Sequence, residues 1–143
     1  MKTWAALFLS LFLVACSFTH DKSNVNTTVS PATLNNEEVK KHTFLKEMYA
    51  DTYFPKPLVD KSKAILLELC SQIESQKPEH LEQLYKLTHA ATIKFNDLED
   101  EFFENGSEIE TVARESIAAD FEFISRSYGF EADTEELIAP RNW

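Results

Sequence analysis

The feature that most constrains this chain is a helical repeat of apolar residues that runs from about residue 37 to the last residues of the sequence. Apolar side chains recur at intervals of three and four residues, no segment alternates like a β-strand, and only Gly106 and Gly129 interrupt the pattern. The repeat predicts an all-α domain over residues 37–143, folded as a compact bundle of about four helices plus a short C-terminal helix. A domain of about 105 residues is long enough for one hydrophobic core.

Prolines, glycines and capping residues indicate where the helices begin and end. Pro57 is tolerated in a first helical turn, Pro78 separates the second helix from the third, and Gly106 follows the end of the third. Ser107 and Glu110 have the spacing of a capping box, so a fourth helix is expected directly after that glycine. The expected helices cover residues 37–50, 57–76, 79–104, 108–128 and 134–139.

Each of the three long helices is expected to bury one face. Cys70 lies on such a face and is interpreted as a buried, inert thiol. Asp120 lies beside another, so it is expected either to pair with a cation from another helix or to rest at the edge of the apolar face. The faces expected to be buried are Leu58, Ser62, Ile65, Leu66, Leu69, Cys70 and Ile73; Leu81, Leu84, Tyr85, Thr88, Ala91, Phe95, Leu98 and Phe102; and Ile109, Val112, Ile117, Phe121, Ile124 and Tyr128.

Residues 1–15 are typical of a bacterial lipoprotein signal peptide. Lys2 precedes an apolar run over residues 4–14, and Ala15 stands directly before Cys16. Crossing a bilayer takes about 20 apolar residues, so this run of about 11 is too short for a retained transmembrane helix. The sequence therefore predicts cleavage before Cys16 and lipidation of that cysteine by palmitate-type acyl chains. An ordinary cleaved signal, which would release a soluble product, is the alternative.

The lipidated N-terminus and a flexible tether are expected over residues 16–36. This segment is rich in serine, threonine and asparagine and has no apolar periodicity. Two or more acyl chains anchor a protein stably to a membrane. Ser17, in place of an aspartate that would resemble an inner-membrane retention signal, favours the outer membrane. The predicted location is the bacterial cell envelope, on the periplasmic face of the outer membrane.

The charge of the chain limits its partners. The formal net charge is −10 at pH 7, and an acidic surface repels nucleic acid and anionic lipid headgroups. We therefore expect a protein partner, one with a basic surface, and no nucleic acid. The expected contact with a membrane is made through the lipid anchor.

Polar residues on the third helix form a candidate interaction surface. Its carboxylates gather near the C-terminal end of the helix, where the helix dipole disfavours negative charge. A solvated helix face and a satisfied polar seam are the structural alternatives. The surface comprises His89, Asn96, Asp97, Asp100, Glu101 and Glu104.

No motif for catalysis, metal binding or cofactor binding is present. The chain lacks a Gly-x-Ser-x-Gly elbow and the paired Glu-x-x-His motifs of carboxylate-bridged bundles. Two glycines are too few for a loop that cradles phosphate. We therefore expect a protein that is not an enzyme and carries no cofactor or metal.

From about residue 43 to residue 143 the chain resembles a family of small bacterial helical proteins known as domain of unknown function 5713. The resemblance implies a compact helical domain and transfers no activity. It depends on residues 44–49 (Phe-Leu-Lys-Glu-Met-Tyr), 84–92 (Leu-Tyr-Lys-Leu-Thr-His-Ala-Ala-Thr), 107–111 (Ser-Glu-Ile-Glu-Thr) and 120–124 (Asp-Phe-Glu-Phe-Ile).

Three functional hypotheses remain open. The first is a protein-binding or accessory module anchored in the cell envelope. The second is an acidic immunity or inhibitor protein against a toxin or enzyme, since an acidic surface speeds encounter with a basic partner. The third is a small-ligand carrier, which would need a cavity that the abundant phenylalanines are expected to fill.

Overall fold

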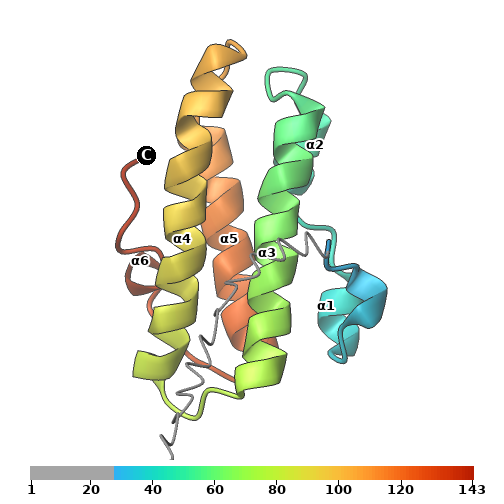
Figure 1. Ribbon diagram of the computed structural model, residues 1–143, viewed down its shortest axis with the longest axis vertical. Helices are drawn as coiled ribbons and strands as arrows, with labels where there is room; N and C mark the ends of the chain where they lie inside the picture. The colour runs from blue at the N-terminus through green and yellow to red at the C-terminus, as the bar shows by residue number, and fades with distance from the viewer. Residues whose placement is uncertain (1–27) are drawn as a thin grey trace, which may run out of the picture.

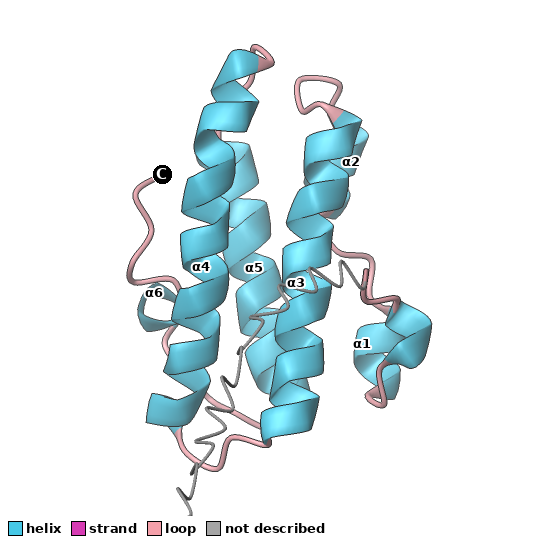
Figure 2. Cartoon of the chain, in the orientation of Figure 1, coloured by secondary structure: helices cyan, strands magenta, loops and turns pink. Residues whose placement is uncertain are grey.

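The computed structural model describes residues 28–143; the predicted signal peptide, Cys16 and residues 17–27 lie outside the described residues. The described part of the chain is helical and contains no strand, which confirms the all-α prediction (Figure 2). In order, the elements are a 3₁₀ helix η1 (Pro31–Thr33) and the α-helices α1 (Glu37–Lys41), α2 (Lys46–Ala50), α3 (Lys56–Gln76), α4 (Leu81–Glu104), α5 (Thr111–Ser127) and α6 (Thr134–Leu137).

The three long helices form the body of the bundle. Helices α3 and α4 run antiparallel side by side, and α5 lies behind them in the view of Figure 1. Helices α1 and α2 flank α5, and α6 packs against α4 and α5. Four phenylalanines fill the centre of one continuous core, as the sequence predicts: Phe44, Phe95, Phe102 and Phe121.

The apolar faces of the long helices are where the periodicity places them. Every residue expected to be buried on α3 is buried, including Cys70. On α4 the expected residues are buried or half-buried. The prediction is wrong for Val112, which is 40% exposed. The buried face of α5 begins at Ala113 and continues through Ile117, Phe121 and Ile124, and Val112 is rotated about 100° away from Ala113.

The single helix expected over residues 37–50 is instead two short helices, α1 and α2. The chain is extended at His42, and Leu45 adopts a left-handed conformation with φ 53°. In one continuous helix Val39, Phe44 and Met48 could not all share a face, because their spacings of five and four residues rotate them apart. The break allows all three side chains to be buried.

The capping box predicted at Ser107 and Glu110 is also wrong. Helix α5 begins only at Thr111, and Glu110 caps it without a side-chain hydrogen bond. Ser107 instead completes the end of α4, because its backbone N–H donates to the carbonyl of Phe102 at 2.9 Å while Gly106, at φ 74°, donates to Phe103 at 3.0 Å. Residues 107–110 form a linker that buries Ile109.

Candidate functional site

Two members of the candidate interaction surface hold the C-terminal segment against α4. Nε2 of His89 donates to the carbonyl of Glu136 at 2.7 Å. Nδ2 of Asn96 donates to the carbonyl of Pro140 at 2.9 Å, and Oδ1 of Asn96 accepts from the backbone of Asn142 at 3.3 Å. His89 and Asn96 therefore use their polar atoms to bind the C-terminal segment of the same chain, which is the structural role given above as an alternative to a binding surface.

The four carboxylates of that surface separate into two groups. Glu101 faces α3, where it forms an ion pair with Lys61. Asp97, Asp100 and Glu104 are exposed, and none of them forms an ion pair with another described residue. The uncompensated charge of the predicted surface therefore lies on these three side chains, over the last two turns of α4.

An exposed aromatic side chain lies among these carboxylates. Phe103 is 69% exposed, the most exposed of the large hydrophobic residues in the described chain. It lines an open hollow of about 600 Å³ together with Glu99, Asp100, Glu108, Ile109, Asn142 and Trp143. Phe103 is not among the predicted site residues; its signal in the sequence is an aromatic side chain that falls off the apolar face of the helix, directly after the buried Phe102.

The electrostatics of this end favour a cation. The last turn of α4 has no basic residue, so the partial negative charge of its terminal carbonyl groups adds to that of the side chains. Lys61 is engaged by Glu101, and Arg141 by Glu135 at 2.6 Å. We call this region the acidic end: Asp97, Glu99, Asp100, Phe103, Glu104 and Glu108.

A second polar cluster has a structural explanation. Asp120 is only 5% exposed, and its two oxygens lie 2.7 Å from Nε2 of His42 and 2.7 Å from the backbone nitrogen of Leu45. Burial raises the pKa of Asp120, and the hydrogen bonds from His42 and Leu45 oppose that shift. His42 also stacks on Phe123, with ring centroids 3.7 Å apart. The pair stabilises the break between α1 and α2. Asp120 is therefore paired with a residue from another segment, and its partner is a histidine ring together with a backbone N–H group.

The His42–Asp120 pair borders an open hollow of about 500 Å³ between α2 and α5. Its wall carries Lys46 together with two carboxylates, Glu47 and Glu115. These mixed charges give the hollow no single electrostatic preference. The acidic end, with one sign of charge and an exposed aromatic ring, is the better candidate for recognition.

The described residues offer no metal centre, since no group of three or more histidine, cysteine and carboxylate side chains in residues 28–143 is placed to hold a metal ion. Burial raises the pKa of the Cys70 thiol to about 12. A thiol that stays protonated at neutral pH is neither a nucleophile nor a good metal ligand. Cys70 is the buried thiol that the sequence predicts.

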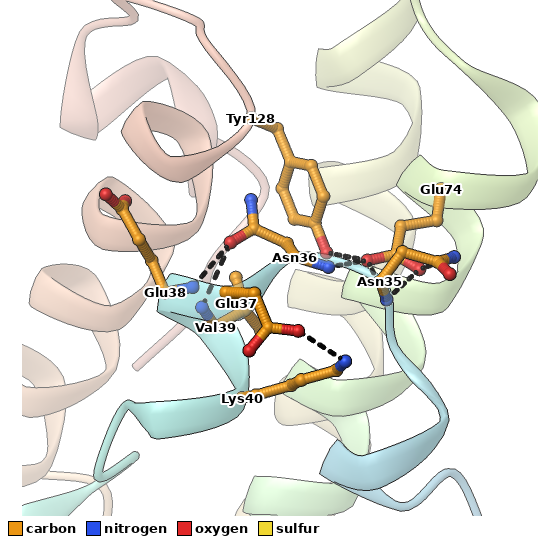
Figure 3. Close-up of polar contacts among 8 residues, drawn as sticks. All are labelled: Asn35, Asn36, Glu37, Glu38, Val39, Lys40, Glu74 and Tyr128. Atoms are coloured by element: carbon orange, nitrogen blue, oxygen red, sulfur yellow. Dashed lines mark hydrogen bonds and ion pairs between the residues drawn. The ribbon is translucent and has the colours of Figure 1, made fainter.

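Residues 28–36, which form the end of the segment expected as a tether, contact the bundle. Leu34 is 3% exposed. The carboxylate of Glu74 on α3 accepts from the backbone of Asn35 at 2.8 and 2.9 Å, from its side chain at 2.8 Å, from the backbone of Asn36 at 3.0 Å and from the Tyr128 hydroxyl at 2.8 Å (Figure 3). We call this cluster the Glu74 clasp and residues 28–36 the arm.

Asn36 links the clasp to two further elements. Its Oδ1 accepts from the backbone N–H groups of Glu38 and Val39 and so caps α1, while its Nδ2 donates to the carbonyl of Ser127 at 2.7 Å. Burial raises the pKa of Glu74, but the donors from Asn36, Asn35 and Tyr128 outweigh it, so that this pKa lies below its usual value. The clasp therefore depends on an ionised carboxylate.

The clasp and the acidic end lie at opposite ends of the bundle. Glu74 is near the C-terminal end of α3, which adjoins the start of α4, whereas the acidic end lies where α4 finishes. In Figure 1 the arm, in blue, runs beside the lower half of α3, and the turn after α4 is at the top. Helix α4 has 24 residues, a length of about 36 Å.

No helix within residues 28–143 combines the length and the apolar character needed to cross a membrane. The predicted lipid attachment at Cys16 lies outside the described residues.

Comparison with known proteins identifies the family. No curated protein and no solved structure matches the chain. The model of a family described as "Family of unknown function (DUF5713)" matches residues 38–143, which is nearly the whole of the described helical domain. The chain therefore belongs to the DUF5713 family.

Proposed function

We propose that this protein is a lipid-anchored, protein-binding module of the bacterial cell envelope and that its acidic end binds a partner with a basic surface. The observation that carries the proposal is the arrangement of Asp97, Asp100 and Glu104 around the exposed Phe103, with no ion pair to these three carboxylates from the described residues. Charged groups left unpaired around an apolar side chain are typical of a recognition surface.

The position of the arm supports a tethered arrangement. A chain anchored at Cys16 would enter the bundle through the arm, which the Glu74 clasp holds beside the C-terminal half of α3. The acidic end would then lie at the far end of the bundle from this point of entry.

Affinity capture from crosslinked membranes of the native host tests the interaction. The full-length tagged chain is compared with a variant carrying Asp97→Asn, Asp100→Asn and Glu104→Gln. A matched control carries Glu79→Gln, Glu82→Gln and Glu131→Gln, three exposed carboxylates away from the acidic end. The proposal expects a stoichiometric partner that the first variant loses and the control keeps; equal capture by all three proteins would contradict it.

The anchor is tested separately with Cys16→Ser. We expect the wild-type chain in the membrane fraction, with the mass of a chain that begins at Cys16 and carries acyl groups. Cys16→Ser should abolish the acylation and leave an unprocessed or soluble product. An unmodified wild-type chain would refute the lipid anchor while leaving the acidic end to be tested on its own.

An inhibitor of a basic toxin or enzyme is the second candidate, and the same observation favours it, because an acidic end with a protruding aromatic ring is suited to covering a basic active site. The identity of the captured partner distinguishes the two functions. Loss of the partner's activity in the complex supports the inhibitor, and retained activity supports the accessory module.

A further inference from the structure

The hollow at the acidic end is incompletely filled. Phe103, Ile109 and Trp143 supply its apolar wall. Trp143 packs on the buried Phe95, with ring centroids 6.3 Å apart, so one part of the indole belongs to the core. Phe103 keeps most of its surface exposed, although burying a phenylalanine is worth about 2 kcal/mol. The hollow therefore offers apolar surface that a partner can cover.

A polar group of Trp143, one of the residues that line the hollow, also lacks a partner. Nε1 of Trp143 is buried and makes no hydrogen bond within the described structure. An indole N–H can only donate, and a buried donor without an acceptor is costly. Because this nitrogen has no exposed surface, a bound segment could reach it only if the indole ring shifted.

The charge of the hollow selects the kind of segment. Glu99, Asp100 and Glu108 lie on its wall, and no basic side chain does. None of these three carboxylates forms an ion pair with another described residue. Lysine or arginine side chains would compensate them, whereas an anionic lipid surface would be repelled. A second copy of the chain, with its net charge of −10, is a poor match.

We propose that the hollow between the end of α4 and Trp143 binds a basic segment of a partner protein, with one large apolar side chain against Phe103 and flanking lysines or arginines at Glu99, Asp100 and Glu108. This inference rests on the proposed function and specifies the chemistry of the partner. The apolar contact with Phe103 contributes most of the affinity, and the charged contacts orient the segment and speed its association.

A designed peptide tests this assignment. The probe is acetyl-Gly-Lys-Lys-Leu-Lys-Lys-Gly-amide, and its control has serine in place of leucine. The full chain is held in phosphatidylcholine nanodiscs and labelled with ¹⁵N-tryptophan. The lipid-anchored chain, which begins at Cys16, keeps only Trp143 of the two tryptophans in the sequence, so it gives a single indole N–H signal. We expect a saturable shift of the Trp143 signal with the leucine peptide and at least tenfold weaker binding of the serine peptide.

Matched variants on α4 locate the binding. Phe103→Ser should weaken the leucine peptide at least tenfold, which corresponds to about 1.4 kcal/mol. Ile93→Ser removes another exposed apolar residue of the same helix, 50% exposed, and should leave the affinity unchanged. Both variants should unfold at the wild-type temperature, because neither side chain is in the core.

The possible outcomes separate this inference from the proposed function. If both peptides bind equally and Phe103→Ser has no effect, the hollow is not the binding site. The acidic end would still be supported if salt weakened the binding of both peptides and if Asp97→Asn and Glu104→Gln weakened it too. If the leucine peptide does not bind at millimolar concentration, both proposals fail at this surface. A Trp143 signal that shifts with protein concentration alone would assign the hollow to a second copy and overturn the inference.

Discussion

Replacement of Glu74 by glutamine should release the arm while leaving the bundle folded. Glutamine keeps the length of the side chain but has one acceptor oxygen, and its amide nitrogen would face the donors of Asn35. The carboxylate now accepts from four donor groups of Asn35, Asn36 and Tyr128. The amide therefore loses at least one hydrogen bond outright and the charge that strengthens the others.

The magnitude follows from the number of donors and the exposure of the site. Hydrogen bonds to a charged group contribute about 1.5–3 kcal/mol when buried, but Glu74 is half-buried and water can replace it as acceptor. Loss of the charge, or of the acceptor itself, costs about 0.5 kcal/mol at each of the four donors in this half-buried site, so Glu74→Gln should weaken the hold on the arm by about 2 kcal/mol. That free energy corresponds to about a thirtyfold change in the equilibrium for opening the arm.

Hydrogen exchange measures this opening directly. The backbone N–H groups of Glu38 and Val39, which Asn36 caps, should exchange about thirtyfold faster in Glu74→Gln. Amides in the middle of α4 should be unaffected, since the change is local. Glu68→Gln is the matched control, because Glu68 is also on α3 and forms a half-exposed ion pair with Lys94 at 2.6 Å, a type of contact worth about 0–1 kcal/mol.

The pH dependence provides an independent check. The folded pKa of Glu74 is lowered, so the clasp has its full strength above the ordinary pKa of about 4.3 and loses it as the pH falls through the folded value. The exchange difference between wild type and Glu74→Gln should therefore shrink in acid. If Glu74→Gln exchanges within twofold of Glu68→Gln at neutral pH, the clasp does not hold the arm and the reasoning is refuted.

Three further predictions concern the rest of the domain. Asp120→Ala should lower the free energy of unfolding by about 2 kcal/mol in denaturant titrations, because it leaves His42 and the N–H of Leu45 without their partner. Asp120→Asn should cost less than about 1 kcal/mol, because its amide oxygen can accept from Leu45 while its amide nitrogen donates to Nε2 of the other His42 tautomer. Burial raises the pKa of Asp120, so the contribution of Asp120 to the free energy of unfolding should fall as the pH rises from about 3.9 through the folded pKa. This pH dependence should disappear in Asp120→Asn. An unchanged pH dependence would show that Asp120 is not its source. Gly129→Ala should lower the free energy of unfolding by about 1 kcal/mol in thermal unfolding, because alanine is strained at the φ of 84° that Gly129 adopts. A steric clash does not contribute, since nothing lies within 4 Å of an added Cβ. An unchanged stability would show that the end of the helix rearranges. The Cys70 thiol should react with a disulfide reagent at pH 8 only on unfolding, because its pKa is raised to about 12 by burial; rapid reaction of the native protein would show that α3 opens.

Family membership and fold class follow from the sequence, because both depend on features that are local in the chain. Periodicity assigns the buried faces of α3 and α4, since spacings of three and four residues fix which side chains share one side of a helix. Pro78, Gly106 and Gly129 mark interruptions for equally local reasons, and Asp133, a residue type favoured at the start of a helix, caps α6. The sequence also indicates that α4 ends among carboxylates.

Only the tertiary structure decides which polar groups are free to bind. The spacing of His89 and Asn96 places them on one side of α4, as a binding surface requires. In the structure, however, both side chains bind the C-terminal segment, more than 40 residues later in the chain. Nothing in the sequence around Glu74 predicts its role, because the groups that donate hydrogen bonds to it come from the arm and from the end of α5. The break between α1 and α2 likewise depends on Asp120, 75 residues beyond Leu45.

The acidic end shows the same division in one place. The sequence alone shows the negative charges of Asp97, Asp100 and Glu104, and it shows that Phe103 lies off the apolar face of the helix. That Phe103 remains exposed, and that Ile109 and Trp143 meet it across a hollow, results from packing between segments distant in the chain. Periodicity determines what a helix buries; the packing of its neighbours determines what it leaves uncovered.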